Sequence, residues 1–559
     1  MTQAWFKDSV IYQIYPRSFQ DSNADGIGDL KGIRTRLDYL KKLGVDVLWL
    51  NPIYRSPDKD NGYDISDYES IQPVYGDMQD FDDLLADMHQ HGLKLLMDLV
   101  VNHTSDEHKW FKESRQSRDN DYSDYYIWRD PVDGHEPNNW GSYFGGPAWT
   151  YEPARKQYYL HLFAPGQPDL NWENPAVRNS VYDVMKFWLD KGIDGFRMDV
   201  INLISKPAGL PDAPQPDGAV YGNAEAVVAD GERLNEYLRE MNREVLSKYD
   251  VMTVGEMPGS KPSDVEDYAS LKGDELNMVF QFEHVSLSSN PNKELGKWND
   301  KPVKLLDLKH ALNRWESDLD GKAWNSLYWN NHDQPRAVSR FATDDPKYRV
   351  AAAKMLGATL HFMQGTPFVY EGEEIGMTNA NFKELAEYED LESLNAYRQF
   401  VTEEHVVAES DMLHYLTNIS RDNARTPMQW TKGTNAGFTD GTPWFGLNKN
   451  YPDINVEDAL TNDDSVFYFY QKLIALRHQL DVVKYGDFKS LDDDDEQVYT
   501  YVREWKGQQL AVVSNFTDQT VERDYSFMSG DKLLISNYPD GDDEKTLLPY
   551  QTKVYFTEK

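Results

Sequence analysis

The sequence predicts an α/β protein: a closed (β/α)8 TIM barrel with an inserted small domain after the third strand and a C-terminal antiparallel β-domain. Eight short apolar runs rich in β-branched or aromatic residues alternate with stretches of helical periodicity, a pattern typical of parallel strands joined by helices. A long interval rich in Tyr, Trp, Asn and Gly follows the third run. From about residue 481 onward the pattern changes to strands alone, which favours a separate antiparallel domain.

Each part of this architecture has its own segments. The eight predicted strands are 10–16, 45–52, 93–101, 195–201, 251–256, 277–283, 325–333 and 366–374. Helical periodicity is clearest at 30–44, 81–92, 177–192 and 236–249. The strands predicted near the C-terminus are 487–491, 497–505, 508–516, 531–538 and 551–556. We therefore expect a barrel in two parts, 1–103 and 174–480, an inserted domain at 104–173 and a β-sandwich at 481–559. The stretch 375–465 is too long for a simple loop and predicts an irregular excursion near the barrel mouth.

Composition and net charge argue against several classes of binding partner and against disulfide bonds. The chain of 559 residues is 40% hydrophobic, and its 94 acidic and 57 basic residues give a net charge of −37. Because this charge is spread along the chain, nucleic acid and anionic membrane are poor candidates as partners. The chain has no cysteine, which excludes disulfides and fits a reducing compartment. With no signal pattern at the start and no apolar run of about 18 residues, we expect a soluble cytoplasmic protein, a monomer or simple homo-oligomer.

The predicted strand GFRMDVI (195–201) contains two charges in an apolar run. Alternation along a strand places Arg197 and Asp199 on one side and Phe196, Met198 and Val200 on the other. A buried ion pair stabilises a fold no more than packed apolar residues of similar volume do. A strand that keeps such a pair therefore often does so for function. A salt bridge that merely sets the strand register explains this heptapeptide equally well.

Polar residues also follow the other predicted strands at their C-terminal ends. They are DNGYD (60–64), DLVVNH (98–103), Glu256, NNHD (330–333) and YEGEE (370–374). Catalytic residues of a (β/α)8 barrel come from the C-terminal ends of several strands, so a ring of charges there indicates an active site more than packing. Three carboxylates converge in this arrangement: Asp199, Glu256 and Asp333.

These carboxylates indicate the kind of chemistry. The sequence has no cysteine nucleophile, no Ser-His-Asp motif and no phosphate-binding glycine loop. Two carboxylates that flank a bond are what glycoside cleavage requires, one to attack or stabilise the sugar cation and one to protonate the leaving oxygen.

Five ordered motifs carry a family resemblance. DLVVNH (98–103), GFRMDVI (195–201), VGEM (254–257) and NNHD (330–333) resemble the four catalytic-strand motifs of the α-amylase family of glycoside hydrolases, in that family's order. QPDLN (167–171) resembles the extra motif of its oligo-1,6-glucosidase and dextran glucosidase branch. The resemblance covers nearly the whole chain and implies a retaining, exo-acting α-glucosidase of short oligosaccharides that needs no cofactor for catalysis.

The resemblance implies roles for the central residues. Asp199 resembles the nucleophile that forms a covalent glucosyl-enzyme, and Glu256 resembles the acid that protonates the leaving sugar and then activates water. Asp333 would hold substrate hydroxyls, and Arg197 would pair with Asp199 and keep it ionised. The remaining substrate-binding residues that the resemblance implies are Asp60, Tyr63, His103, Phe144, Phe163, Gln167, Val200, His332, Gln334 and Arg425.

Several of these implied roles are specific. Asp60 and Arg425 resemble a charge pair that closes the pocket at one end, and Tyr63 would stack below the sugar. His103 and His332 resemble hydrogen-bonding histidines and show no metal-ligand spacing, which argues against catalytic zinc. For Phe144 and Phe163, a role as ordinary core aromatics of the inserted domain stays open.

Linkage preference is predicted from the residue after the nucleophile. Branch members with valine there, as at Val200, tend to prefer α-1,6 bonds, since bulk on the leaving-group side disfavours an α-1,4-linked ring. By a looser alignment, Lys297 and Glu392 resemble residues that contact the leaving sugar.

The segment DSNADGIGD (21–29) resembles the structural calcium loop of this branch. Asp21, Asn23, Asp25, Asp29 and the carbonyl of Ile27 would supply oxygen ligands. An EF-hand is excluded because Gly32 occupies its twelfth position. A solvated acidic turn without metal is the alternative.

Other functions stay open. A trehalose-6-phosphate hydrolase shares nearly all these motifs but needs a basic pocket, which the overall acidity disfavours. An α-1,4-active, sucrose-acting or transglucosylating relative is a further alternative, although no Arg-rich segment like that of isomerases lies between Glu256 and Asp333. Non-enzymatic relatives lose the catalytic carboxylates and carry a membrane anchor, and this chain differs on both points.

Overall fold

The computed structural model describes residues 4–215, 219–525, 528, 532–539 and 545–558. Its central sheet is parallel and has the strand order β11-β10-β9-β5-β2-β1-β13-β12. The strands are β1 (Ile11–Ile14), β2 (Val47–Leu50), β5 (Lys94–Val100), β9 (Gly195–Asp199), β10 (Met252–Glu256), β11 (Met278–Phe280), β12 (Ser326–Tyr328) and β13 (Thr366–Tyr370). Each lies in one of the eight predicted runs, which confirms the predicted fold class. At the seam between β11 and β12, the Ser326 hydroxyl donates to the Val279 carbonyl at 2.7 Å.

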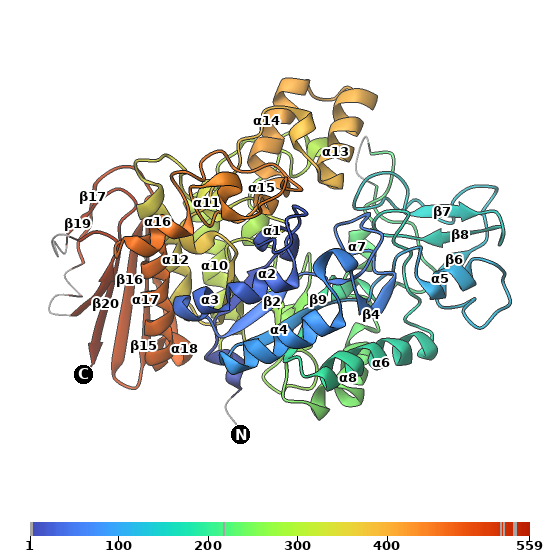
Figure 1. Cartoon of the computed structure of the whole chain (residues 1–559), viewed down its shortest axis with the longest axis horizontal. Helices are drawn as coiled ribbons and strands as arrows, with labels where there is room; N and C mark the ends of the chain where they lie inside the picture. Colours follow the sequence, from blue (N-terminus) through green and yellow to red (C-terminus); the bar gives the residue numbers. More distant parts are fainter. Residues whose placement is uncertain (1–3, 216–218, 526–527, 529–531, 540–544, 559) are drawn as a thin grey trace.

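Helices surround this sheet (Figure 1). They include α2 (Leu30–Thr35), α3 (Leu37–Leu43), α4 (Met78–Gln90), α6 (Pro175–Lys191), α8 (Leu234–Glu244), α10 (Leu305–Leu319), α12 (Arg349–His361) and α17 (Val466–Gln479). The single helix predicted at 30–44 is two helices, because Arg36 leaves helical geometry. Its guanidinium donates to Gln20 Oε1 and lies 4.0 Å from the centre of the Trp430 ring. This tertiary contact outweighs the local helical periodicity.

The inserted segment after β5 carries its own small sheet, to the right in Figure 1. It contains α5 (Lys109–Ser114) and the antiparallel strands β6 (Trp128–Arg129), β7 (Trp149–Glu152) and β8 (Gln157–Leu160). Lys206 joins it to the barrel: its Nζ donates to Asn102 Oδ1 at 2.7 Å and lies 2.7 Å from Asp169 Oδ2. A short hairpin not predicted from the sequence, β3 (Tyr54–Arg55) and β4 (Asp67–Ile71), lies beside this segment's entry.

Two further parts complete the fold. The stretch after β13 forms α13 (Leu391–Tyr397), the π-helix η9 (Arg398–Glu403), α14 (Glu409–Ile419) and α15 (Asp422–Arg425), at the top of Figure 1. The C-terminal antiparallel sheet has the order β14-β15-β16-β20-β18: β14 (Asp487–Leu491), β15 (Val498–Trp505), β16 (Gln508–Asn515), β18 (Lys532–Ser536) and β20 (Thr552–Glu558). A second, two-stranded sheet pairs β17 (Val521–Glu522) with β19 (Thr546–Leu547). Asp531, where one predicted strand begins, lies outside the described residues.

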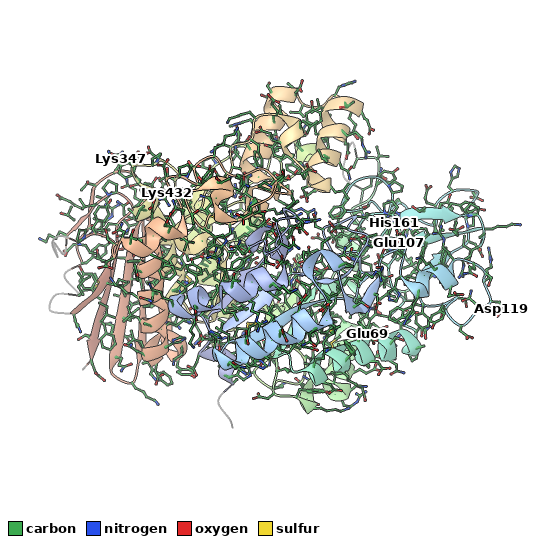
Figure 2. All side chains as sticks on the ribbon, in the orientation of Figure 1. Glu69, Glu107, Asp119, His161, Lys347 and Lys432 are labelled. Atoms are coloured by element: carbon green, nitrogen blue, oxygen red, sulfur yellow. The ribbon has the colours of Figure 1, made fainter. Side chains whose placement is uncertain are left out.

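The surface carries charge on separate parts of the fold. Figure 2 shows the exposed side chains of Asp119, Glu69 and Lys432 on distant segments. Within the described part of the chain, no helix is both long and apolar enough to cross a bilayer.

Candidate active site

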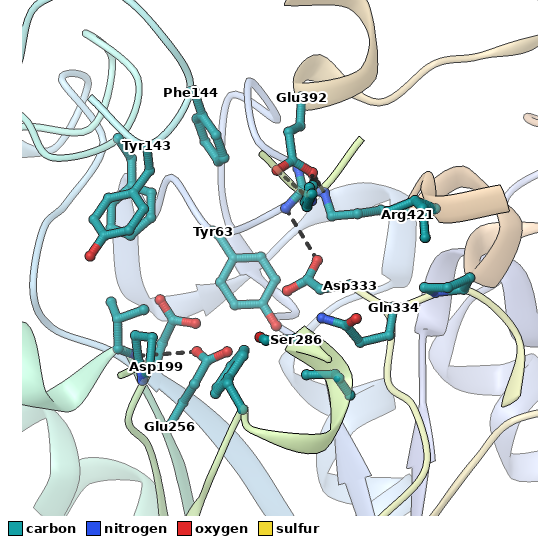
Figure 3. A pocket seen from close by; sticks show the side chains of 18 of the residues that line it. Tyr63, Tyr143, Phe144, Asp199, Glu256, Ser286, Asp333, Gln334, Glu392 and Arg421 are labelled. Atoms are coloured by element: carbon teal, nitrogen blue, oxygen red, sulfur yellow. Dashed lines mark hydrogen bonds and ion pairs between the residues drawn. The ribbon is translucent and has the colours of Figure 1, made fainter. Parts of the chain in front are cut away.

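A cavity of about 470 Å³ lies at the C-terminal ends of the barrel strands. Asp199 ends β9, Glu256 ends β10 and Asp333 follows β12, and all three line this cavity (Figure 3). The structure therefore brings together the three carboxylates that the sequence singled out. This position is where (β/α)8 barrels carry their catalytic residues.

Arg197 holds the carboxylates in place. One nitrogen, Nη1, donates to Asp199 Oδ1 and to Asp98 Oδ1, each at 2.6 Å. The other, Nη2, lies 2.5 Å from Glu256 Oε2. Arg197 is 1% exposed, so these interactions are shielded from water and salt. Alternation along β9 does place Arg197 and Asp199 as neighbours, and the pair belongs to a network that also fixes Glu256.

The backbone after the nucleophile position is strained. Val200 has φ 36° and ψ 41°, a left-handed conformation that costs a β-branched residue about 1–2 kcal/mol. The turn ends β9 directly after Asp199 and points the Val200 amide at Glu256 Oε2, 3.2 Å away. Backbone strain of this kind persists where the surrounding structure enforces it. Here the strained turn directs the amide that follows Asp199 toward the Glu256 carboxyl.

The electrostatics assign different protonation states to Glu256 and Asp199. Burial raises the pKa of Glu256 to about 8, and the nearby charge of Asp199 adds to this. Burial also raises the pKa of Asp199, to about 6, but Arg197 opposes the increase. A hydrogen bond between the two carboxyls favours a proton on Glu256 and the charge on Asp199. Near neutral pH the site thus holds one ionised carboxylate beside one carboxylic acid.

Asp333 is ionised over a wide pH range. Burial opposes its ionisation, but the guanidinium groups of Arg421 and Arg425 outweigh burial and hold its pKa well below the usual range. Arg425 Nη2 donates to Asp333 Oδ1 at 2.7 Å, and Arg421 Nη1 does so at 3.2 Å. Asp333 can therefore accept hydrogen bonds from sugar hydroxyls without changing its charge.

The rings of Tyr63 and His332 stack on each other at the site. The Tyr63 and His332 rings are nearly parallel, 3° apart in plane angle, with centroids separated by 5.3 Å. Gln13 Nε2 donates to His332 Nδ1 at 2.9 Å, so the ring proton lies on Nε2, which faces Asp333 Oδ2 at 3.2 Å. Burial lowers the pKa of His332 to about 3, so the ring is a neutral donor.

Asp98 was not singled out by residue from the sequence, although it begins the DLVVNH motif. It lies on β5, with no measurable side-chain exposure, and accepts hydrogen bonds from Arg197, Trp49 Nε1 and Tyr63 OH, the last two at 3.1 Å. It therefore couples the position of Arg197 to that of the Tyr63 ring. The pairing of neighbouring strands could have identified Asp98 from the sequence. Asp98 is the charged residue of β5 that lies in register with Arg197 on β9.

His103 and Gln167 occupy different positions relative to the cavity. His103 lines it, and burial lowers its pKa to about 4. Gln167 is fully buried and is not among the residues that line the cavity, so its predicted part in substrate binding stays a prediction. Its amide instead donates to Asp60 Oδ2 at 2.9 Å and so positions that carboxylate.

The structure does not pair Asp60 with Arg425 as predicted: among the described residues, Arg425 forms ion pairs with Asp333 and Asp390. The cation nearest Asp60 is Arg421, whose Nη2 lies 3.8 Å from Asp60 Oδ1. Arg425 lies deeper, where its Nη1 donates to Asp390 Oδ2 at 2.7 Å. Arg421, the N-cap of α15, and Arg425, its last residue, lie four positions apart, and the buried Asp390, which was not singled out from the sequence, binds both. Sequence spacing alone could not decide which arginine faces the cavity.

Aromatic residues form one wall of the cavity. Phe144 lies under the guanidinium of Arg421, 5.4 Å from its carbon to the ring centre. Phe163 stacks on Tyr143 with a centroid separation of 5.0 Å and contacts Phe144 edge-on. All three line the cavity, so the two predicted phenylalanines are wall residues, and Tyr143 is an addition from the structure.

Further residues complete the lining of the cavity. They are Gln334, Val200, Phe282, three serines and an ion pair between Lys297 Nζ and Glu392, 2.6 Å apart; Glu392 also lies 3.5 Å from Arg421 Nε. Glu256 is the carboxylic acid and ends β10. The neighbouring strand in the sheet, β11, leads into the segment that contains Phe282 and the three serines. The segment after β11 is thus placed to contact the group that Glu256 protonates.

The 21–29 loop has the oxygen-rich composition that suits calcium, and its oxygens are largely engaged. Asp21 accepts from the amides of Asn23, Ala24 and Gly26 and from the Thr439 hydroxyl. Asp29 caps α2 through the Gly32 amide. Asn23 and Asp25 are exposed and each accept one backbone amide, from Asp25 and Ile27 respectively. Within the described ranges, no three acidic or histidine side chains are grouped as metal ligands.

Comparison with known proteins agrees with this geometry. The family model for the alpha amylase catalytic domain matches residues 13–486. An oligo-1,6-glucosidase of Parageobacillus thermoglucosidasius is 55% identical over 99% of both chains, and that of Bacillus cereus is 53% identical over 99% of this chain and 100% of its own. The crystal structure of Bacillus licheniformis trehalose-6-phosphate hydrolase is 48% identical, with a TM-score of 0.93 over 100% of both chains. The chain therefore belongs to the α-amylase family of glycoside hydrolases, family 13.

Proposed function

We propose that this enzyme is a retaining, exo-acting α-glucosidase that hydrolyses α-1,6 bonds at the nonreducing ends of isomaltose and short isomalto-oligosaccharides. The observation that carries the proposal is that a single buried guanidinium, Arg197, binds both Asp199 and Glu256, and both carboxyls line one cavity. The full-length similarity to oligo-1,6-glucosidases supports the substrate class.

The reaction follows from the two protonation states. Asp199 attacks the anomeric carbon while Glu256 gives its proton to the glycosidic oxygen, so the leaving sugar departs neutral and a glucosyl ester forms on Asp199. Glu256, now ionised, takes a proton from water, whose oxygen attacks the same carbon and releases Asp199. Two inversions give net retention. Arg197 stabilises whichever of the two carboxylates is charged at each stage.

Exo-action follows from a proposed closed end of the cavity at Asp60 and Arg421. These side chains lie 3.8 Å apart, with the ring of Phe144 under the guanidinium, an arrangement that would admit a terminal glucose and no chain beyond it. Asp333, His103 and His332 are placed to bind the hydroxyls of that glucose, with Tyr63 beneath it. Val200 lines the same cavity next to Asp199, where its branched side chain would disfavour an α-1,4-linked ring.

We also propose a structural calcium ion in the 21–29 loop and no cofactor for catalysis. Carboxylate, amide and carbonyl oxygens are the ligands that calcium prefers, and the exposed Asn23 and Asp25 are accessible to it. Calcium would then shift the melting temperature and leave kcat unchanged. Titration with a chelator, followed by calcium addition, tests this; an unchanged melting temperature would contradict it. A cytoplasmic monomer or simple oligomer remains our expectation from composition.

The experiment for the substrate is glucose release from isomaltose, maltose, sucrose and trehalose 6-phosphate, measured in parallel at equal concentration. Isomaltose well ahead of maltose is expected. Trehalose 6-phosphate ahead of the others would keep the mechanism and change the substrate, and sucrose ahead would favour the transglucosylating relatives.

A further inference from the structure

A chain of hydrogen-bonded side chains lies beneath the catalytic cavity. It runs from Asp98 through Tyr63, Asn51 and Gln13 to His332. Gln13 lies on β1 and Asn51 directly follows β2, and the two residues are 1% and 2% exposed. Neither of them lines the cavity, and neither was singled out from the sequence.

The hydrogen bonds of this chain have one direction, which Asp98 sets. Asp98 Oδ1 accepts from Arg197 Nη1 at 2.6 Å, and although burial raises the pKa of Asp98 to about 6, the carboxylate is ionised at neutral pH and only accepts. The Tyr63 hydroxyl therefore gives its single proton to Asp98 Oδ2, at 3.1 Å. The Tyr63 oxygen can then only accept, and it does so from Asn51 Nδ2 at 2.6 Å.

The two amides pass this direction on to the imidazole. Because the nitrogen of the Asn51 amide faces Tyr63, its Oδ1 faces Gln13 and accepts from Gln13 Nε2 at 2.9 Å. The second N–H of Gln13 Nε2 donates to His332 Nδ1, also at 2.9 Å. Neither amide can turn over without placing two acceptors against each other, so the ring proton of His332 lies on Nε2.

The proton on His332 Nε2 is available to a substrate. This buried nitrogen lies 3.2 Å from Asp333 Oδ2, yet no acceptor among the described residues is aligned with it for a hydrogen bond. Figure 3 shows the Tyr63 ring with Asp199 and Glu256 on one side of it in the view and Asp333 on the other. A buried donor without an acceptor is unfavourable, and a hydroxyl of a bound sugar can satisfy it.

The groups around His332 keep its ring neutral. Burial lowers the pKa of His332 to about 3; the charge of Asp333 opposes this, and the charges of Arg425, Arg197 and Arg421 add to it. Arg425 Nε also donates to the His332 backbone carbonyl at 3.0 Å. The aromatic rings that pack on the imidazole are those of Tyr15, Trp49 and Tyr63. A neutral imidazole holds one proton, so the direction of the chain decides which nitrogen carries it.

We propose that Gln13 and Asn51 are positioning residues of the glucosidase reaction. They fix the direction of the chain, which places the imidazole proton on His332 Nε2 for a hydroxyl of the terminal glucose and holds the Tyr63 ring by its hydroxyl beneath the same sugar. A buried polar network with every member satisfied specifies one arrangement of its side chains. The inference rests on the proposed function of the cavity and adds two residues that act through others.

The first variants change the donors of Gln13 and keep its size. In Gln13→Glu, the introduced carboxyl and His332 together hold one extra proton at low pH. When that proton leaves, the carboxylate requires a proton on Nδ1, and Nε2 loses its own. The pH optimum of kcat/KM for isomaltose should therefore decrease by about one pH unit or more. Gln13→Met has no donor and should lower kcat/KM about tenfold at every pH, the effect of one buried hydrogen bond.

Gln551 offers matched controls. It is 2% exposed in the C-terminal domain, and its side chain accepts from the Leu548 amide at 2.8 Å. Gln551→Glu and Gln551→Met should lower the melting temperature and leave the pH optimum unchanged. Gln13→Met combined with Asn51→Leu should lower kcat/KM by no more than about twofold beyond the larger single effect, because both substitutions break one chain.

The ring proton can be located directly by NMR of the full chain with isotope-labelled histidine, without substrate. The His332 signal is the one that is absent from His332→Gln. At neutral pH the wild-type ring should carry its proton on Nε2. In Gln13→Glu the proton should lie on Nδ1 at a pH above the shifted optimum.

A wild-type ring protonated on Nδ1 would overturn the inference, even if no Gln13 variant folds. A folded Gln13→Glu variant with the wild-type pH optimum would equally overturn it, and melting temperatures at each pH show whether the variant is folded. Because the NMR measurement uses no substrate, a protein with the expected ring proton that does not hydrolyse isomaltose would contradict the proposed function alone.

Discussion

Arg197 and Asp199 are joined by a 2.6 Å hydrogen bond between side chains two residues apart on one strand. The same guanidinium contacts Glu256 through its other terminal nitrogen, so nucleophile and acid share one rigid reference group. A buried charge cluster of this kind contributes little net stability, since desolvation offsets the attraction. Its effect is to fix the relative position of the two reacting carboxyls before substrate arrives.

Asp199→Asn should lower kcat by at least roughly 10³-fold, because the amide cannot form the glucosyl ester. The fold should be retained, since an amide fills the same volume and still accepts from Arg197. Steady-state kinetics and circular dichroism check the two statements. The control is Asp183→Asn on the exposed face of α6, which should leave kcat unchanged. An Asp199→Asn variant with more than a trace of activity would exclude this residue as nucleophile.

The rate should depend on pH in a bell shape. Asp199 must be ionised to attack, so kcat/KM should fall as pH decreases through its pKa of about 6. Glu256 must be protonated to act as acid, so kcat/KM should fall as pH increases through its pKa of about 8. The profile of Glu256→Gln, measured with a substrate whose leaving group needs no proton, should lose the alkaline limb. An alkaline limb that persists there would assign the acid to another group.

Arg421 and Arg425 should differ in what their loss affects. Arg421→Gln removes the cation at the closed end and should raise KM for isomaltose about tenfold or more, the effect of a charged hydrogen bond. Both variants take a partner from the fully buried Asp390, so each should lower the free energy of unfolding by about 3 kcal/mol. Arg425→Gln also removes the 2.7 Å donor of Asp333 and should lower kcat as well. Kinetics and thermal melting measure these effects, and a larger rise in KM from Arg425→Gln than from Arg421→Gln would restore the pairing of Asp60 with Arg425.

Lys206 should be a structural cation at the junction of barrel and inserted segment. Its Nζ donates to Asn102 Oδ1 and the Leu203 carbonyl, at 2.7 and 2.6 Å, and pairs with the buried Asp169. Lys206→Met would leave Asp169 without its cation and should cost about 3–5 kcal/mol of stability. The exposed Lys186→Met is the control, with little effect expected. Denaturant unfolding curves measure both, and equal stabilities would contradict this role.

The periodicity of apolar residues and the spacing of the apolar runs predicted the barrel. Buried parallel strands appear in a sequence as short apolar runs, here eight, between amphipathic helices. They could not predict the break at Arg36, which depends on contacts with Gln20 and Trp430 from distant segments. The hairpin β3–β4 was missed because its first strand has two residues and no alternation to detect.

The catalytic carboxylates were predictable because the C-terminal ends of barrel strands converge regardless of the conformation of the loops. The ion pairs between carboxylates and arginines in the pocket were not predictable in this way. Arg421 and Arg425 lie four positions apart and both bind Asp390, the N-cap of α13 in the same excursion after β13, so spacing does not show which of them approaches Asp60. Tyr143 likewise reaches the cavity from a turn of the inserted segment, outside its helices and strands. Such contacts are set by tertiary packing, which local patterns do not encode.

The most direct measurement is mass spectrometry of the enzyme after incubation with 5-fluoro-α-glucosyl fluoride, a substrate that forms the intermediate faster than it is hydrolysed. One fluoroglucosyl group per chain is expected, on the peptide that contains Asp199, and no label in Asp199→Asn. Label on Glu256, or turnover of this reagent without any covalent adduct, would contradict the double-displacement mechanism.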